Sequence, residues 1–172
     1  MQVRTISTQK WKPPATDWIK INVDSTFFNG VAFSGCIIRN HNGSILQAYS
    51  QKHQCLDSLV AECLAVLDGC ALAMQLNAKK VVFEADCLNA ITLINGVSLN
   101  TFWPADPVVE RIKRAWKSWP LWSFSFTHRG NNCAAHNLAF CSSLKNFVGF
   151  YPLNSIPLNV FCDGGYPIVD SF

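Results

Sequence analysis

The sequence predicts an α/β domain built on a mixed sheet with helices on both faces. Alternating apolar residues indicate strands, and apolar residues at helical spacing indicate the helices between them. The predicted order is strand, strand, strand, helix, strand, helix, helix, strand, helix. Three hairpin strands followed by strands that return through helices give a five-stranded sheet, antiparallel first and parallel afterwards.

Composition fits one globular domain. The chain has 172 residues, of which 49% are hydrophobic and 15% charged, so it can bury a sizeable core and is not expected to be disordered. Its net charge of +3 is too small to indicate a nucleic-acid partner by itself, because such partners are recognised by clustered charge.

Three regions are expected along the chain. Residues 1–17 form a leader that contains the stiff Lys12-Pro13-Pro14, residues 18–145 form the domain, and residues 146–172 form an irregular tail rich in Pro, Gly and Asn.

The first three strands are predicted at 18–26, 31–39 and 44–50. Both breaks between them contain Asn and Gly, which tolerate turn dihedral angles, so the strands form an antiparallel meander. Gly35 and Cys36 are small residues within the second strand, and they allow another element to pack closely there.

A first helix follows from Asp57, with Ser58 or Asp57 as its N-cap and Asn77 as its end. The remaining elements are a short apolar strand and a helix that begins after Asp86, a helix with a basic stripe, an alternating strand and a last helix, at 80–85, 88–94, 104–119, 121–128 and 132–144. The basic stripe could follow a phosphate backbone, although a solvated helix face is the simpler explanation.

The eight cysteines contain no C-x-x-C pair, and a disulfide framework is possible on their number alone. The helical spacing of Cys63 and Cys70, and of Cys133 and Cys141, suits small buried apolar residues instead. The sequence shows no apolar run typical of a signal peptide and no stretch long enough to span a membrane. We therefore expect eight free thiols, a reducing compartment, either nuclear or cytoplasmic, and no membrane partner.

Three carboxylates are candidates for one site. Asp24 ends the first strand, Glu62 lies on the first helix and Asp86 ends the fourth strand. Each alone has a simpler explanation, as a turn residue, a favourable charge in a helix dipole or an N-cap. If the first and fourth strands are neighbours, however, the three acids converge, and such a group requires a divalent cation.

Four fragments in this order are similar to a known family: Ile21-Asn22-Val23-Asp24, Ala61-Glu62-Cys63-Leu64-Ala65, Phe83-Glu84-Ala85-Asp86-Cys87 and Arg129-Gly130-Asn131-Asn132-Cys133-Ala134-Ala135-His136-Asn137-Leu138-Ala139. Together they resemble the type 1 ribonuclease H domain, in the plant reverse-transcriptase-like version found in non-LTR retrotransposons and their descendants. The resemblance covers about residues 11–144 and includes Trp11-Lys12-Pro13-Pro14.

The resemblance implies a ribonuclease H-like fold and a two-metal hydrolysis of the RNA strand in RNA–DNA hybrids. Carried over by position, the catalytic and metal-binding residues are Asp24, Glu62, Asp86 and His136, with Asp24 bridging two Mg²⁺ ions. Arg129 and Asn132 are the implied substrate-binding residues.

Two positions depart from the family pattern. His136 stands where many relatives have aspartate, although histidine is also familiar in the plant subfamily, and imidazole suits Mn²⁺ better than Mg²⁺. Ser25 stands where relatives commonly have glycine, and its side chain could crowd the substrate.

Three functions stay open. The chain could be a metal-dependent endonuclease acting on RNA–DNA hybrids, which is the interpretation that the complete acidic set favours. It could instead be a catalytically weak or inactive nucleic-acid-binding or interaction module of retrotransposon origin, which His136 favours. The third is an unrelated α/β domain whose acids are caps and surface groups. A monomer that binds an RNA–DNA hybrid or another nucleic acid is expected in the first two cases.

Overall fold

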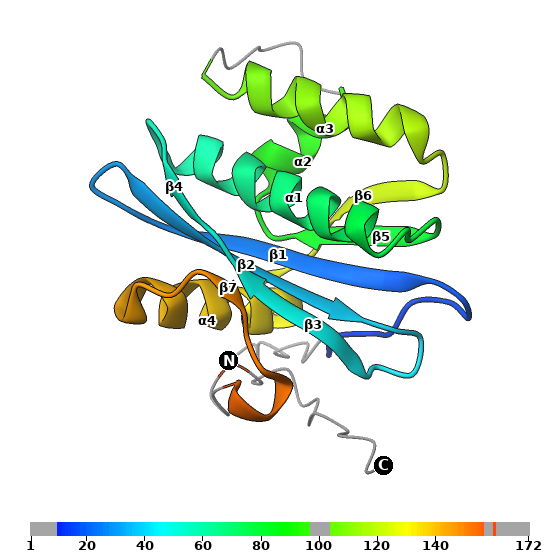
Figure 1. Cartoon of the computed structure of the whole chain (residues 1–172). Coiled ribbons are helices and arrows are strands. Elements are labelled where there is room, and N and C mark those ends of the chain that lie inside the picture. Colours follow the sequence, from blue (N-terminus) through cyan, green and yellow to red (C-terminus); the bar gives the residue numbers. More distant parts are fainter. Residues whose placement is uncertain (1–9, 97–103, 157–159, 161–172) are drawn as a thin grey trace, which may run out of the picture.

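A mixed seven-stranded sheet lies at the centre of the structure, a computed structural model that describes residues 10–96, 104–156 and 160 (Figure 1). Its strand order is β6-β5-β1-β2-β3-β7, and β4 also pairs with β2. The strands are β1 (Ile19–Phe28), β2 (Val31–Arg39), β3 (Ile45–Ser50), β4 (Lys52–Gln54), β5 (Val81–Ala85), β6 (Trp122–Phe126) and β7 (Gly149–Phe150). β1 is antiparallel to β2 and parallel to β5, which is parallel to β6.

The α/β class and the mixed sheet are confirmed, but the predicted number of five strands is wrong. The additional strands are β4, which pairs with the start of β2 beside the end of β3, and β7, which pairs with β3 at the sheet edge. Each has three residues or fewer, too short to show an alternating pattern. They are strands because of tertiary pairing.

Helices cover both faces of the sheet, as predicted. α1 (Ser58–Gln75), α2 (Leu88–Asn95) and α3 (Asp106–Ser118) lie on one side, and α4 (Arg129–Lys145) lies on the other (Figure 1). Asp57 caps α1 by accepting a hydrogen bond of 3.0 Å from the Val60 amide. The last helix begins at Arg129, three residues before the predicted start, and a 3₁₀ turn, Leu153–Ser155, follows β7.

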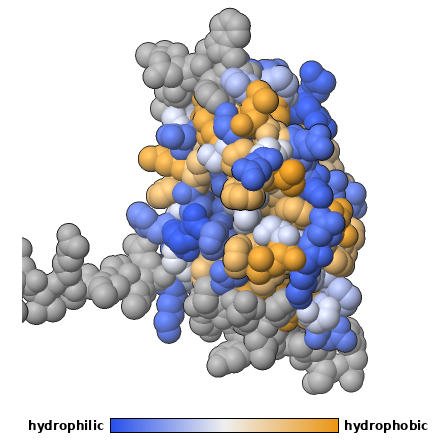
Figure 2. Space-filling view, turned by 90° about the vertical axis from the view of Figure 1, so that its left-hand side faces the viewer, coloured by the Kyte–Doolittle hydropathy of each residue, from blue (hydrophilic) through white to orange (hydrophobic). Residues whose placement is uncertain are grey.

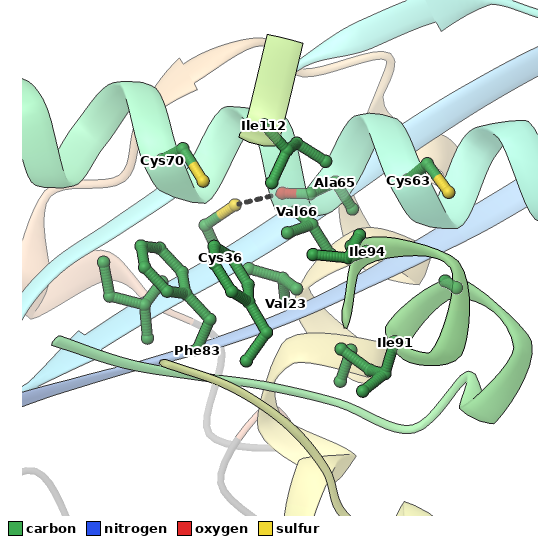
Figure 3. Packing of buried hydrophobic residues seen from close by; sticks show 14 of the residues in the cluster. Val23, Cys36, Cys63, Ala65, Val66, Cys70, Phe83, Ile91, Ile94 and Ile112 are labelled. Atoms are coloured by element: carbon green, nitrogen blue, oxygen red, sulfur yellow. Dashed lines mark hydrogen bonds between the residues drawn. The ribbon is translucent and has the colours of Figure 1, made fainter. Parts of the chain in front are cut away.

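The main core lies between the sheet and the three helices. Figure 3 shows residues of β1, β5 and α1 meeting Ile91 and Ile94 of α2 and Ile112 of α3. Phe83 of β5 is fully buried and stacks on Phe124 of β6, with ring centroids 4.7 Å apart. Burial of these side chains fixes α1 against the strands that carry the candidate acids.

α1 meets the length and composition of a membrane-spanning helix, contrary to the expectation that no stretch does. Half of it is buried within the domain, where it packs against β1, β2 and α3. Its apolar composition is accounted for by this place in the core.

The cysteines were predicted to be buried small residues, and Cys36, Cys63 and Cys70 are buried and free. Six of the described cysteines are free. Cys133 is disulfide-bonded, so the prediction of eight free thiols is wrong at this residue. Sequence spacing gave no pattern from which this bond could be inferred.

α4 contacts the sheet at Gly35 of β2. A Cβ atom at this glycine would lie 2.6 Å from the backbone nitrogen of Ala139 and closer still to the carbonyl oxygen of Ala135. The prediction that small residues here admit another element is thus confirmed, and the element is α4. Since Gly35 pairs with Asp24, this contact brings α4 alongside the first candidate acid.

A second core lies on the α4 side of the sheet. Ile37 and Ala48 of the sheet meet Leu138 of α4 and three later residues, Tyr151, Ile156 and Val160. The hydroxyls of Ser142 and Tyr151 are hydrogen-bonded at 2.8 Å. The domain limits of 18–145 stay a prediction, but residues beyond 145 contribute to this core.

The end of the molecule with the β1–β2 turn has a mixed surface, on which apolar residues lie among polar ones (Figure 2). A groove of about 560 Å³ is lined there by residues of the hairpin and of α4, among them Phe28, which is 75% exposed, and Phe140.

Candidate metal centre

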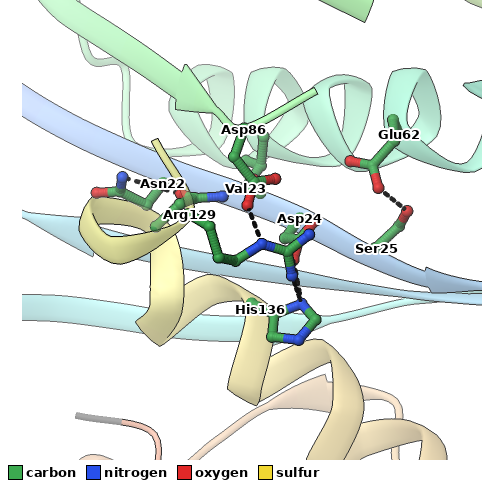
Figure 4. Close-up of polar contacts among 9 residues, drawn as sticks. Asn22, Val23, Asp24, Ser25, Glu62, Asp86, Arg129 and His136 are labelled. Carbon is green, nitrogen blue, oxygen red and sulfur yellow. Dashed lines mark hydrogen bonds and ion pairs between the residues drawn. The ribbon is translucent and has the colours of Figure 1, made fainter. Parts of the chain in front are cut away.

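The three candidate acids converge. Asp24 lies two residues beyond the last β1–β5 pair, Asn22↔Glu84, and Asp86 directly follows β5. The prediction that Asp24 ends its strand is wrong, because β1 stays paired with β2 as far as Phe28. Glu62 projects from the second turn of α1 (Figure 4). One carboxylate oxygen from each lies within 4.8 Å of the others. The expectation that the first and fourth predicted strands are neighbours is confirmed, and it explains this convergence.

Burial and the neighbouring charge of Asp24 disfavour the charged forms of Glu62 and Asp86. Asp24 is fully buried, and within the described part of the chain no hydrogen-bond donor reaches its Oδ1 or the Oε2 of Glu62. Burial, reinforced by the charge of Asp24, raises the pKa of Glu62 to about 9. Burial and the charge of Asp24 also raise the pKa of Asp86, against the opposing effects of Arg129, His136 and Asn132.

Such a donor set fits a hard divalent cation. Its ligand atoms are carboxylate oxygens, which Mg²⁺ and Ca²⁺ prefer, and two oxygens of these carboxylates are buried with no hydrogen-bond partner among the described residues. A cation placed among them would relieve the repulsion. Asp86 does not cap α2, whose N-cap is Cys87, so its carboxylate is available to the site.

Two side chains of α4, Arg129 and His136, lie between Asp24 and solvent. Arg129 forms an ion pair with Asp86 through Nε, and its Nη1 lies 3.5 Å from Oδ2 of Asp24 and contacts Nδ1 of His136. The same Oδ2 is 2.6 Å from Nδ1 of His136. The side chains of Arg129 and His136 are 57% and 39% exposed. His136 is not part of the group of three carboxylates and reaches it through Asp24.

Asn132, an implied substrate-binding residue, lies inside the protein. It is fully buried, and its Nδ2 donates to the carbonyl oxygen of Val23 at 2.9 Å. Its Oδ1 accepts a hydrogen bond of 3.1 Å from Asn22. These bonds support the site from within the protein, whereas Arg129 faces solvent. A substrate-binding role for Asn132 stays a prediction.

Ser25 is a further residue of the site. Its hydroxyl donates to Oε1 of Glu62 at 2.8 Å (Figure 4), which orients this carboxylate and lowers the pKa of Glu62 against the effect of burial. The sequence alone suggests that Ser25 crowds the substrate, and it indicates no role for Asn22. A polar amide on the same strand face as Asp24, two residues before it, is the pattern that could have drawn attention to Asn22.

A mixed sheet of this order with helices on both faces defines an α/β domain. The chain matches the reverse transcriptase-like family over residues 22–141 and belongs to it. A search of curated proteins found no sequence match.

Solved structures show the ribonuclease H-like fold. Ribonuclease H1 from the halophilic archaeon Halobacterium salinarum NRC-1 has a TM-score of 0.70 and 15% identity, over 76% of this chain and 99% of that one. LC11-RNase H1, a compost metagenome protein, was solved with an RNA/DNA hybrid and has a TM-score of 0.68 and 18% identity, over 74% and 98%. The N-terminal RNase H domain of Rv2228c from Mycobacterium tuberculosis has a TM-score of 0.67 and 16% identity, over 76% and 99%.

Proposed function

We propose that this protein is a metal-dependent endonuclease that hydrolyses the RNA strand of RNA–DNA hybrids. The observation that carries the proposal is the convergence of Asp24 of β1, Glu62 of α1 and Asp86, which follows β5, within 4.8 Å. The ribonuclease H-like fold supports it, and so does the RNA/DNA hybrid in the structure of LC11-RNase H1.

Asp24, Glu62, Asp86 and His136 are the residues that would hold the metal. A bound divalent cation stabilises negative charge on the phosphoryl group under attack. The protein keeps its ligands in place: the sheet fixes Asp24, Ser25 orients Glu62, and the end of β5 presents Asp86. Arg129, exposed beside them, is placed to bind a phosphate of the substrate.

We propose Mg²⁺ as the metal, with Mn²⁺ as an alternative that His136 favours. Mg²⁺ prefers oxygen ligands, while imidazole is a softer, neutral ligand that Mn²⁺ accepts more readily. The three carboxylates suit either ion, so the preference depends on the exposed imidazole. A monomer that acts in the nucleus or the cytoplasm, and a retrotransposon origin of the plant type, complete the proposal.

Arg129 favours a second candidate, a nucleic-acid-binding module without efficient catalysis. Its guanidinium contacts both Asp24 and Asp86, so it supplies positive charge where a metal would. If this ion pair holds the acids better than a cation does, the chain binds a hybrid without cleaving it.

Cleavage of a labelled RNA–DNA hybrid separates the two candidates. The wild type, Asp24→Asn and the control Asp106→Asn, which makes the same change at the start of α3, are assayed in Mg²⁺ and in Mn²⁺. We expect cleavage by the wild type and by Asp106→Asn, and loss of at least about 100-fold in Asp24→Asn, as when an electrostatic contribution to the transition state is removed. Hybrid binding without cleavage in either metal would instead establish the binding module.

A further inference from the structure

The segment before β1 reaches the metal centre through hydrogen bonds. Nε1 of Trp11 donates to Oδ1 of Asn22 at 2.8 Å. The guanidinium of Arg39 lies over the Trp11 ring, with its Cζ 4.5 Å from the ring centroid. Nζ of Lys20 donates to the carbonyl oxygen of Lys12 at 2.7 Å. Contacts with β1 and β2 therefore hold this segment, although Trp11 lies outside the residues that match the family.

The side-chain amide of Asn22 connects Trp11 to polar residues inside the protein. Asn22 is buried, and its Nδ2 donates both to Oε2 of Glu84 and to Oδ1 of Asn132, each at 3.1 Å. Glu84 in turn pairs with Lys20 at 2.7 Å. Because Nδ2 of Asn22 donates to these two interior residues, its Oδ1 points toward the segment before β1. There it accepts a hydrogen bond from Trp11. Without the indole N–H a buried carbonyl oxygen would lose its partner.

Asn132 completes the connection to the site. The β1–β5 pairing ends at Asn22, and the next carbonyl, that of Val23, accepts its hydrogen bond from Asn132 instead. Asn132 lies three residues after Arg129 and four before His136, so all three share one face of α4. Fixing Asn132 under β1 thus fixes the face that holds Arg129 and His136 against Asp24.

We propose that Trp11 is a positioning residue of the metal centre, acting through Asn22 and Asn132 on the placement of α4 against Asp24. The inference rests on the proposed function for its effect on metal binding. Its structural part, the link from Trp11 to α4, stands on the hydrogen bonds alone.

The test compares Trp11→Phe with Trp116→Phe in the full chain. Both changes keep an aromatic ring and remove one indole hydrogen bond, and that of Trp116 goes to the carbonyl oxygen of Trp122, away from the site. In Trp11→Phe without metal, we expect shifted NMR signals of the Asn132 amide and the His136 ring. Calorimetry should show Mn²⁺ binding weakened about fivefold, the factor that one hydrogen bond supplies. In Trp116→Phe both should stay as in the wild type, whatever happens to the melting temperature.

Three results would overturn the inference. One is a Trp11→Phe protein that melts earlier but keeps the wild-type Asn132 and His136 signals. Another is equal changes in both variants, and the third is a Trp11→Phe chain that does not fold, since its role would then be general stability. A wild type that binds no metal and cleaves no hybrid would contradict the proposed function, while the NMR comparison would still decide the link from Trp11 to α4.

Discussion

The fold and the proposed metal binding favour opposite protonation states of the Glu62 carboxyl. It is held in a buried place beside Asp24, and with its pKa at about 9 it carries a proton at neutral pH in the metal-free protein. Metal binding must release that proton, so the affinity for metal should rise with pH.

The same group predicts how stability depends on pH. Between the ordinary pKa of 4.5 and about 9 the folded chain binds one proton more than the unfolded chain. The contribution of Glu62 to the free energy of unfolding is therefore fully present below pH 4.5 and is lost as the pH rises through 9. Between these values the free energy of unfolding falls by up to about 1.4 kcal/mol per pH unit. We expect Glu62→Gln to remove this slope in thermal unfolding with chelator from pH 5 to pH 9.

Glu110→Gln is the matched control, because Glu110 is exposed on α3. It should keep the pH dependence of the wild type. A wild type whose melting temperature rises across this range, or a Glu62→Gln curve parallel to it, would contradict the assignment.

Single residues differ in how far the sequence could predict them. Asp24, Glu62 and Asp86 could be placed together because each follows from the position of its element and from one rule about parallel strands. Asn132 could not, since the direction of its side chain depends on where α4 starts, and the Arg-Gly-Asn-Asn sequence of its first turn favours helix weakly. The bond from Trp11 to Asn22 has no sequence pattern at all.

At the scale of elements, the contact between α4 and β2 decides where the basic residues lie. No side chain separates the two backbones at Gly35, so even a methyl group has no room there. We expect Gly35→Ala to lower the free energy of unfolding by about 3 kcal/mol or more and to move α4 away from Asp24.

Denaturant unfolding measures the first effect, and the NMR shift of His136 reports the second. The control is Gly130→Ala on α4 itself, where a Cβ would meet no atom within 4 Å. There alanine should change stability by less than about 1 kcal/mol, in the stabilising direction. Similar losses in both variants would argue against the tight contact.

Elements with a repeating pattern could be predicted, and those made by distant pairing could not. The Asn29–Gly30 turn has positive φ at both residues, as the hairpin prediction requires, and Asp57 is one of the two caps that the sequence allowed. β7 exists because it meets β3 across about a hundred residues of chain. Nothing within its own two residues specifies a strand.

For the whole molecule, the second core predicts that the domain needs residues beyond 145. Tyr151, Ile156 and Val160 are buried there against α4 and the sheet. A chain that ends at residue 146 should be less stable than one that ends at residue 160 by at least about 4 kcal/mol, from the apolar surface of these three side chains. Chemical unfolding of both chains measures the difference, and equal stabilities would show that the domain ends where the sequence indicated.

Overall topology was the part of the fold that the sequence predicted best. The hairpin turns predict β1, β2 and β3 as antiparallel neighbours, and the crossover rule allows β1 and β5 to be parallel neighbours. The contribution of residues beyond 145 to the second core was not predicted, because Tyr151, Ile156 and Val160 lie in a stretch without periodicity. Their burial depends on the surface that α4 leaves uncovered.

The close backbone contact at Gly35 also affects how such a site can change during evolution. The spacing between α4 and Asp24 is set by main-chain atoms, whereas the imidazole of His136 projects partly into solvent. A lineage can therefore exchange the residue at position 136 for another ligand, or for none, without refitting the interior. Descendants with different metal requirements, or with none, become accessible from one scaffold by single substitutions.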